Sequence, residues 1–159
     1  MSMTKFKAKL IVYSDGAARG NPGPAGAGGI IKDMSGEVLA EISEYLGETT
    51  NNVAEYKALI LTLEKALQYG KDEVEIYLDS ELLVRQLTGA YKVKNEGLKP
   101  LFERVRQLLT AFNKASIEHV YRSENARADK LANGAIDKFK RWGKAKKKLD
   151  NIPEQESLF

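Results

Sequence analysis

The sequence contains no cysteine and only one histidine. This chain therefore cannot form a disulfide, use a thiolate nucleophile or bind zinc through sulfur. A single histidine also excludes a metal centre built from several histidines. No apolar run approaches the roughly 20 residues that a membrane-spanning helix needs. The first residues lack the cationic, apolar and small-residue order of a secretory signal. A cytoplasmic protein with no membrane segment is the expectation.

The length of 159 residues predicts a single domain with a substantial core. Its net charge of +3 is too small to indicate a polyanionic partner by itself, but the charge is unevenly distributed. Cations gather in residues 138–148, near the C-terminus. We expect a folded domain over 1–142 and a flexible basic tail over 143–159. The tail either contacts phosphate or is merely solvated.

Apolar patterning predicts an α/β fold. Strands are expected at 7–14, 26–33, 37–45, 74–78 and 116–121. Helices are expected from Asn51 or Asn52 to Tyr69, from Ser80, over 98–112 and from about Asn125. Short turns should make the first three strands antiparallel, whereas helical crossovers should make the later ones parallel. The prediction is a five-stranded mixed sheet flanked by helices.

Four acidic residues stand at the ends of these elements. Asp15 and Asp79 each follow an apolar strand, and Asp15 precedes a glycine-rich turn. Neighbouring parallel strands would bring both to one edge of the sheet. Glu55 and Asp129 are placed in the first turns of helices, where an acid is also favoured simply by the helix dipole.

Carboxylates without histidine or cysteine ligands form a hard, oxygen-rich site suited to Mg²⁺ or Mn²⁺. Two such ions, about 3.5 to 4 Å apart, can activate a water and stabilise the leaving oxygen of a phosphodiester. Hydrolysis would then need no protein nucleophile.

The acids lie within four motifs that occur in a fixed order along the chain. These are Asp15-Gly16 with Gly20-Asn21-Pro22-Gly23, Thr50-Asn51-Asn52 with Glu55, Asp79-Ser80, and Asn125 with Ala128-Asp129. Over about residues 7–139 the chain resembles ribonuclease H, type 1. The resemblance implies a ribonuclease H-like fold and endonucleolytic hydrolysis of the RNA strand of RNA/DNA hybrids with two Mg²⁺, leaving 5′-phosphate and 3′-hydroxyl ends.

The resemblance also implies roles for individual residues. Asp15, Glu55, Asp79 and Asp129 would be the catalytic metal ligands, with Asp15 and Asp79 holding both ions. The implied substrate-binding residues are Gly16, Ala17, Ala18, Asn21, Thr50, Asn52, Ser80, Lys92 and Lys94. The glycines can equally make a tight turn, an asparagine can cap the helix, and the two lysines can belong to a solvated loop.

The chain departs from the family pattern at three places. Glu81 stands where the family often has glutamine, which puts one base-edge contact in doubt. Residues 91–95 lead almost directly into the next helix, which indicates a compact form without the basic helical protrusion of many members. His119 falls inside the fifth strand, so we expect a structural role for it. Arg122 or Glu124 would then be the candidate for assisting product release.

The final residues, Gln155-Glu156-Ser157-Leu158-Phe159, resemble the peptide by which bacterial replication and repair proteins bind the sliding clamp. Gln155, Leu158 and Phe159 would make that contact; the alternative is a disordered terminus. Two other functions remain open. One is a non-catalytic hybrid-binding or clamp-tethered adaptor, whose sign would be a missing acid. The other is a related metal-dependent nuclease with a different nucleic-acid substrate. A monomer is expected in each case.

Overall fold

A computed structural model describes residues 8–151 of the chain. Five strands form one sheet in the order β3-β2-β1-β4-β5. They are β1 (Lys9–Ala18), β2 (Gly23–Lys32), β3 (Val38–Thr49), β4 (Glu73–Leu78) and β5 (Lys114–His119). β2 is antiparallel to β1 and β3, while β4 is parallel to β1 and β5. The predicted mixed sheet is confirmed.

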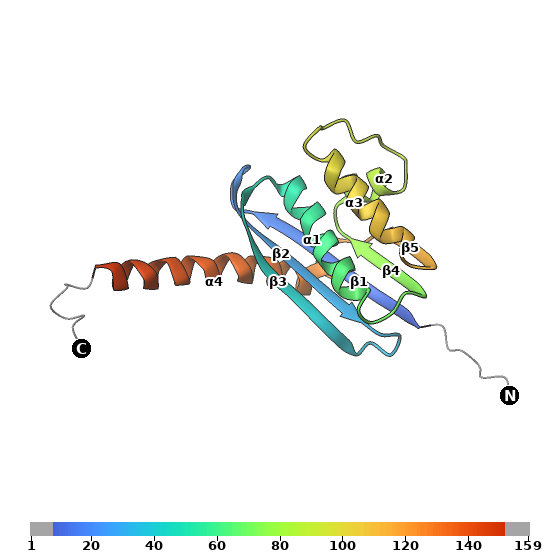
Figure 1. Ribbon diagram of the computed structural model, residues 1–159, viewed down its shortest axis with the longest axis horizontal. Coiled ribbons are helices and arrows are strands. Elements are labelled where there is room, and N and C mark those ends of the chain that lie inside the picture. Colours follow the sequence, from blue (N-terminus) through green and yellow to red (C-terminus); the bar gives the residue numbers. More distant parts are fainter. Residues whose placement is uncertain (1–7, 152–159) are drawn as a thin grey trace.

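The helices cover the two faces of this sheet unequally (Figure 1). They are α1 (Asn51–Ala66), α2 (Glu81–Leu87), α3 (Lys99–Thr110) and α4 (Ala126–Asp150), the last preceded by the 3₁₀ turn η1 (Arg122–Asn125). α1 and α3 enclose the main core, in which Val12 and Ile76 of the sheet pack with Leu59 and Val105. α4 crosses the opposite face. None of the helices described is long and apolar enough to cross a membrane.

β1 is longer than its apolar residues predicted. Asp15 does not follow the strand but lies within it, paired with Gly28 of β2, and pairing continues to Ala18 and Ala25. The parallel pairing of β1 with β4, however, ends at Tyr13 and Tyr77. Asp15 and Asp79 therefore each stand two residues beyond the last parallel pair, so the expected juxtaposition does not depend on where β1 ends.

Two helices begin on side-chain caps. Thr50 caps α1 by accepting a hydrogen bond from the Val53 amide at 3.3 Å, so neither Asn51 nor Asn52 is the cap. Ser80 caps α2 in the same way through the Leu83 amide, at 3.2 Å. A serine or threonine oxygen satisfies amide groups that have no partner inside the helix. Both helices are thereby fixed immediately beside the acids Glu55 and Asp79.

α4 packs directly on the backbone of β2. A side chain at Gly28 would overlap the Ala128 carbonyl, and one at Gly26 would overlap the Ala132 carbonyl. On the neighbouring strand, the Ser43 hydroxyl donates to the Leu131 carbonyl at 2.7 Å. These contacts place the first turns of α4, and with them Asp129, against the sheet.

The C-terminal half of α4 corrects the expected tail. Residues 143–150 continue the helix in place of a flexible segment, because lysine and alanine are good helix formers. Trp142 lies on this part of the helix and is 57% exposed, so it does not pack into the core. The proposed clamp-binding residues Gln155, Leu158 and Phe159 lie outside the described residues.

Candidate active site

Four acidic side chains from four elements line one cavity of about 210 Å³. Asp15 comes from β1, Asp79 from the residue after β4, and Asp129 from the first turn of α4. Glu55 is the fifth residue of α1 and thus lies just past the first turn expected for it. Arg122 is the one basic side chain among the cavity-lining residues described.

The acids repel one another electrostatically. Burial, the negative charges of Asp79, Asp129 and Glu55, and a hydrogen bond with Asp129 together raise the pKa of Asp15 to about 8, and burial is the largest of these causes. Burial is also the main cause that raises the pKa of Glu55 to about 6, against the opposing effects of a Ser80 hydrogen bond and the Arg122 charge. Desolvation and like charges both disfavour the ionised carboxylate. A positive charge bound among these carboxylates would therefore stabilise their ionised forms.

The donor set suits a hard divalent cation, since it consists of carboxylate oxygens. Yet within residues 8–151 no group of three or more acidic, histidine or cysteine side chains has the geometry of a preformed metal centre. A bound divalent cation would offset the repulsion between these carboxylates. The residues present thus fit a divalent cation, while their role as ligands stays a prediction.

Two asparagines that we did not select as site residues position two of the acids. Asn125 is 1% exposed, and its amide group donates to Asp79 Oδ2 at 3.2 Å and to the Ser14 carbonyl at 2.9 Å. Asn133 donates to Asp129 Oδ1 at 3.1 Å, one helical turn along α4. The spacing from Asp129 to Asn133 could have revealed the second contact; the first depends on tertiary structure.

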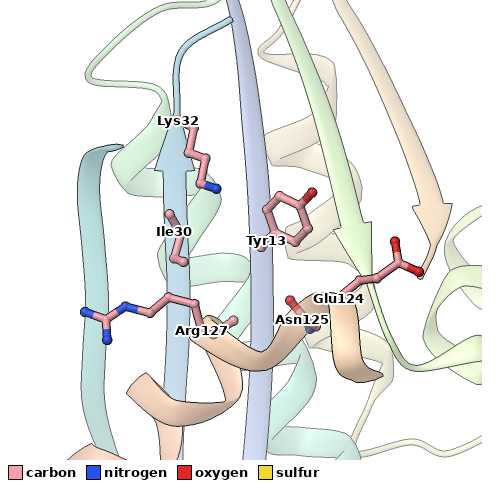
Figure 2. A pocket seen from close by; sticks show the side chains of 7 residues that line it. Tyr13, Ile30, Lys32, Glu124, Asn125 and Arg127 are labelled. Carbon is pink, nitrogen blue, oxygen red and sulfur yellow. The ribbon is translucent and has the colours of Figure 1, made fainter. Parts of the chain in front are cut away.

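Asn125 also borders a second, smaller cavity of about 110 Å³ on the α4 side of the sheet (Figure 2). Lys32 extends there toward the Tyr13 ring, with its amine 5.6 Å from the ring centroid. Arg127 turns away and forms a two-point ion pair with Glu41, at 2.8 and 3.0 Å. The side-chain oxygen Oδ1 of Asn125 is buried without a hydrogen-bond partner among the described residues.

The backbone of residues 16–18 forms one wall of the active-site cavity. Gly16 is needed here for packing, because a side chain at this position would overlap the Ala54 carbonyl and the Glu55 amide of α1. The Ala18 amide donates to Asn51 Oδ1 at 2.9 Å. In turn, Asn21 Oδ1 accepts from the Asn51 amide at 3.2 Å. Asn51 thus links the glycine-rich turn to α1.

The remaining predicted contacts are spread over a wider surface. Asn52 and Ser80 line a hollow shared with Glu55. The hydroxyl oxygen of Thr50 already accepts a hydrogen bond from the Val53 amide as the cap of α1. Lys92 and Lys94 lie exposed between α2 and α3, and they line neither the active-site cavity nor the hollow that Asn52 and Ser80 share with Glu55. That connecting segment contains no added helix, as the compact form predicts.

His119 ends β5 instead of lying in its interior. It is exposed, and its Nε2 lies 3.3 Å from the Asp79 carbonyl oxygen. Because this contact is with the main chain of Asp79, His119 can help to hold the backbone that carries the Asp79 carboxylate.

Comparisons with known proteins agree with this geometry. Residues 13–135 match the family described as reverse transcriptase-like. The chain is 34% identical over 155 residues to the ribonuclease H of Ruegeria sp., an alignment that covers 87% of this chain and 98% of that protein. The chain belongs to the ribonuclease H family.

Other ribonuclease H proteins are more similar in sequence. Ribonuclease HI of Halobacterium salinarum is 48% identical over 129 residues, covering 81% of this chain and 65% of that protein. The structure of LC11-RNase H1 in complex with an RNA/DNA hybrid is 50% identical with a TM-score of 0.77, covering 81% of this chain and 97% of that one. The chain spans between 36% and 65% of the length of several curated relatives that it matches.

Proposed function

We propose that this chain is an endoribonuclease that hydrolyses the RNA strand of RNA/DNA hybrids, leaving 5′-phosphate and 3′-hydroxyl ends. The observation that carries the proposal is the convergence of Asp15, Glu55, Asp79 and Asp129 on one cavity, beside the backbone of residues 16–18. The similarity to LC11-RNase H1, whose structure contains an RNA/DNA hybrid, supports the substrate class.

Asp15, Glu55, Asp79 and Asp129 would hold two Mg²⁺ ions, with Mn²⁺ as a possible substitute. When bound, these ions supply activation of the attacking water and stabilisation of the leaving 3′ oxygen. The chain itself orients the ligands: Asn125 holds Asp79 and Asn133 holds Asp129. Arg122 adds a positive charge to the same cavity, where it can contact a phosphate oxygen.

Hybrid recognition requires a surface that distinguishes ribose from deoxyribose, and the 2′-hydroxyl is the group that differs. The backbone of residues 16–18 can approach a minor groove closely because the side chains there are small. Asn52 and Ser80 are side chains close to Glu55 that can hydrogen-bond a sugar hydroxyl or the flanking backbone. Thr50 is the candidate for a DNA-strand phosphate, since a hydroxyl that accepts in a cap can still donate.

The test is cleavage of end-labelled RNA/DNA hybrid, RNA duplex, DNA duplex and single-stranded RNA, with and without Mg²⁺. Internal cuts confined to the RNA of the hybrid, dependent on Mg²⁺ and lost in Asp79→Asn, are expected. Glu103→Gln, which removes one exposed acid from α3, is the matched control and should cut normally.

Other outcomes of this assay would overturn the proposal. Cleavage of another nucleic acid in preference would identify a nuclease with a different substrate. Hybrid binding without cutting in either Mg²⁺ or Mn²⁺ would favour the adaptor, although all four acids are present.

A further inference from the structure

The second half of α4 leaves the body of the protein as a projecting helix (Figure 1). The last aromatic contact between α4 and the sheet is made by Phe139, whose ring stacks on that of Tyr45 at a centroid distance of 3.8 Å. Beyond it, residues 140–150 lie exposed except for the partly buried Gly143. This segment therefore contributes little to the core that the sheet and the other helices form.

The projecting segment concentrates the positive charge of the chain. Residues 138–150 contain seven lysine or arginine residues and one acid, a net charge of +6, whereas the whole chain carries +3. All other residues together therefore sum to −3. Like charges at helical spacing repel one another and destabilise an isolated helix. An anionic partner would relieve this repulsion.

Three of the seven basic side chains lie on the face of α4 that carries Asp129. Asp129, Asn133, Lys140, Lys144 and Lys147 follow one another at intervals of four, seven, four and three residues, which places them on one face of α4. None of these three lysines forms an ion pair with the described residues. One face of one helix thus begins at a proposed metal ligand and continues as a row of free amines.

An open hollow of about 560 Å³ lies beside the first part of α4, from Arg127 to Arg141. Its lining includes Asp129 and Asn133 at one end and Lys138 and Arg141 at the other. Arg19, from the turn after β1, reaches across to Asn133 and Asp137 and adds a cation to the same side. The hollow therefore extends along α4 from Asp129 to Lys138 and Arg141, while Arg19 is paired with Asp137.

We propose that this face of α4 binds the sugar-phosphate backbone of the nucleic-acid duplex where it continues away from the cleavage site. From Asp129 to Lys147 the helix extends about 27 Å at 1.5 Å per residue. A duplex advances roughly 3.4 Å per base pair, so the lysines reach phosphates about eight base pairs from the cut. The projecting helix would supply the electrostatic contacts that the compact form lacks between α2 and α3.

The proposal rests on the proposed function only in its choice of hybrid as the partner, and binding can be measured without cleavage. Fluorescence anisotropy in EDTA would compare RNA/DNA hybrids of about 6 and about 20 base pairs. Lysine contacts need no metal, so the long hybrid is expected to bind under these conditions. Affinity would be measured for the wild type and two double variants at salt concentrations from about 50 to about 200 mM.

The test variant is Lys144→Gln with Lys147→Gln. Glutamine keeps the helix propensity of lysine, so the helix should persist, and circular dichroism would check this. The matched control is Lys71→Gln with Lys114→Gln, which changes net charge equally at the opposite edge of the sheet. Each lost phosphate contact lowers the slope of log affinity against log salt by about one.

For the long hybrid, wild type and control should lose about tenfold more affinity over this salt range than the test variant. The short hybrid should not distinguish the three proteins. Equal behaviour of the test and control variants on the long hybrid would overturn the proposal, as would equal losses on both lengths or no binding in EDTA. Loss of cleavage with these binding differences intact would count against the proposed function alone.

Discussion

The side-chain nitrogen Nδ2 of Asn125 lies 3.2 Å from the Asp79 carboxylate and 2.9 Å from the main-chain carbonyl oxygen of Ser14. A single buried side chain thereby joins β1, the end of β4 and the start of α4. These are three of the four elements that carry the acids. Asn125 is therefore a positioning residue whose loss should affect both the site and the fold.

Asn125→Ala is expected to lower kcat/KM or the apparent Mg²⁺ affinity by about 10- to 100-fold, the effect typical of residues that orient metal ligands. It should also lower the free energy of unfolding by about 1 to 3 kcal/mol, because the Ser14 carbonyl loses its partner while buried. Cleavage rates against Mg²⁺ concentration and denaturant unfolding measure the two effects. Asn113→Ala, at an exposed position, is the control, and a twofold or smaller change at Asn125 would contradict this role.

The stability of the metal-free protein should fall as pH rises. The pKa of Asp15 is raised from 3.8 to about 8 in the fold, so folding favours the protonated form. Its contribution to stability is complete below pH 3.8 and is lost as pH rises through about 8. Glu55 adds to this loss around pH 6. Thermal unfolding in EDTA should show a melting temperature several degrees lower at pH 8 than at pH 5. Asp15→Asn should flatten this dependence, and Mg²⁺ should restore stability at pH 8 by binding the native state.

Asp79→Asn should stabilise the metal-free protein while it abolishes cleavage. The charge of Asp79 is the largest cause after burial that raises the pKa of Asp15, so removing it relieves repulsion. In EDTA at pH 8 the melting temperature of this variant should exceed that of the wild type. Glu103→Gln should leave it unchanged. A lower melting temperature for Asp79→Asn would show that the acids do not repel one another as inferred.

Gly16→Ala should destabilise the protein by about 1 to 3 kcal/mol, because the added methyl group would overlap the backbone of Ala54 and Glu55. The shift of α1 needed to admit it would also displace Glu55, so cleavage should fall. Gly134→Ala is the matched control, since nothing lies within 4 Å of a side chain there. In a helix this change should stabilise by up to about 1 kcal/mol. Equal effects at the two positions would rule out close packing as the reason for Gly16.

Deleting residues 155–159 should leave hybrid cleavage intact and remove binding to a bacterial sliding clamp. The motivation is the terminal Gln155, Leu158 and Phe159 pattern. Surface plasmon resonance with immobilised clamp would measure the second effect. Clamp binding that survives the deletion would dispose of the docking hypothesis.

The sheet was predictable because its central strands carry apolar side chains in recognisable patterns. The first residues of β2 escaped prediction because Gly23, Pro24 and Ala25 resemble a turn, although they pair with Thr49, Glu48 and Gly47 of β3. The end of α4 escaped for a different reason. Its lysines were interpreted as a solvated tail, whereas their helix propensity continues the helix to Asp150.

The four acids that line the cavity were predictable because each lies near the predicted end of a strand or the predicted start of a helix. The contact of Asn125 with Asp79 joins residues 46 positions apart, so no local pattern indicates it. Likewise, the role of Asn51 depends on how closely the turn after β1 approaches α1.

The absence of side chains at Gly26 and Gly28 restricts how the position of Asp129 can change during evolution. Main chain meets main chain at this contact, so even alanine would force α4 away from β2 and carry Asp129 with it. Residues larger than alanine would overlap the backbone of α4 even more, so no series of small substitutions is tolerated at these two positions. Substitution of either glycine would therefore require that Asp129 first be moved or lost. Two residues of β2 that have no side chains thus constrain the chemistry of a helix about 100 residues later in the sequence.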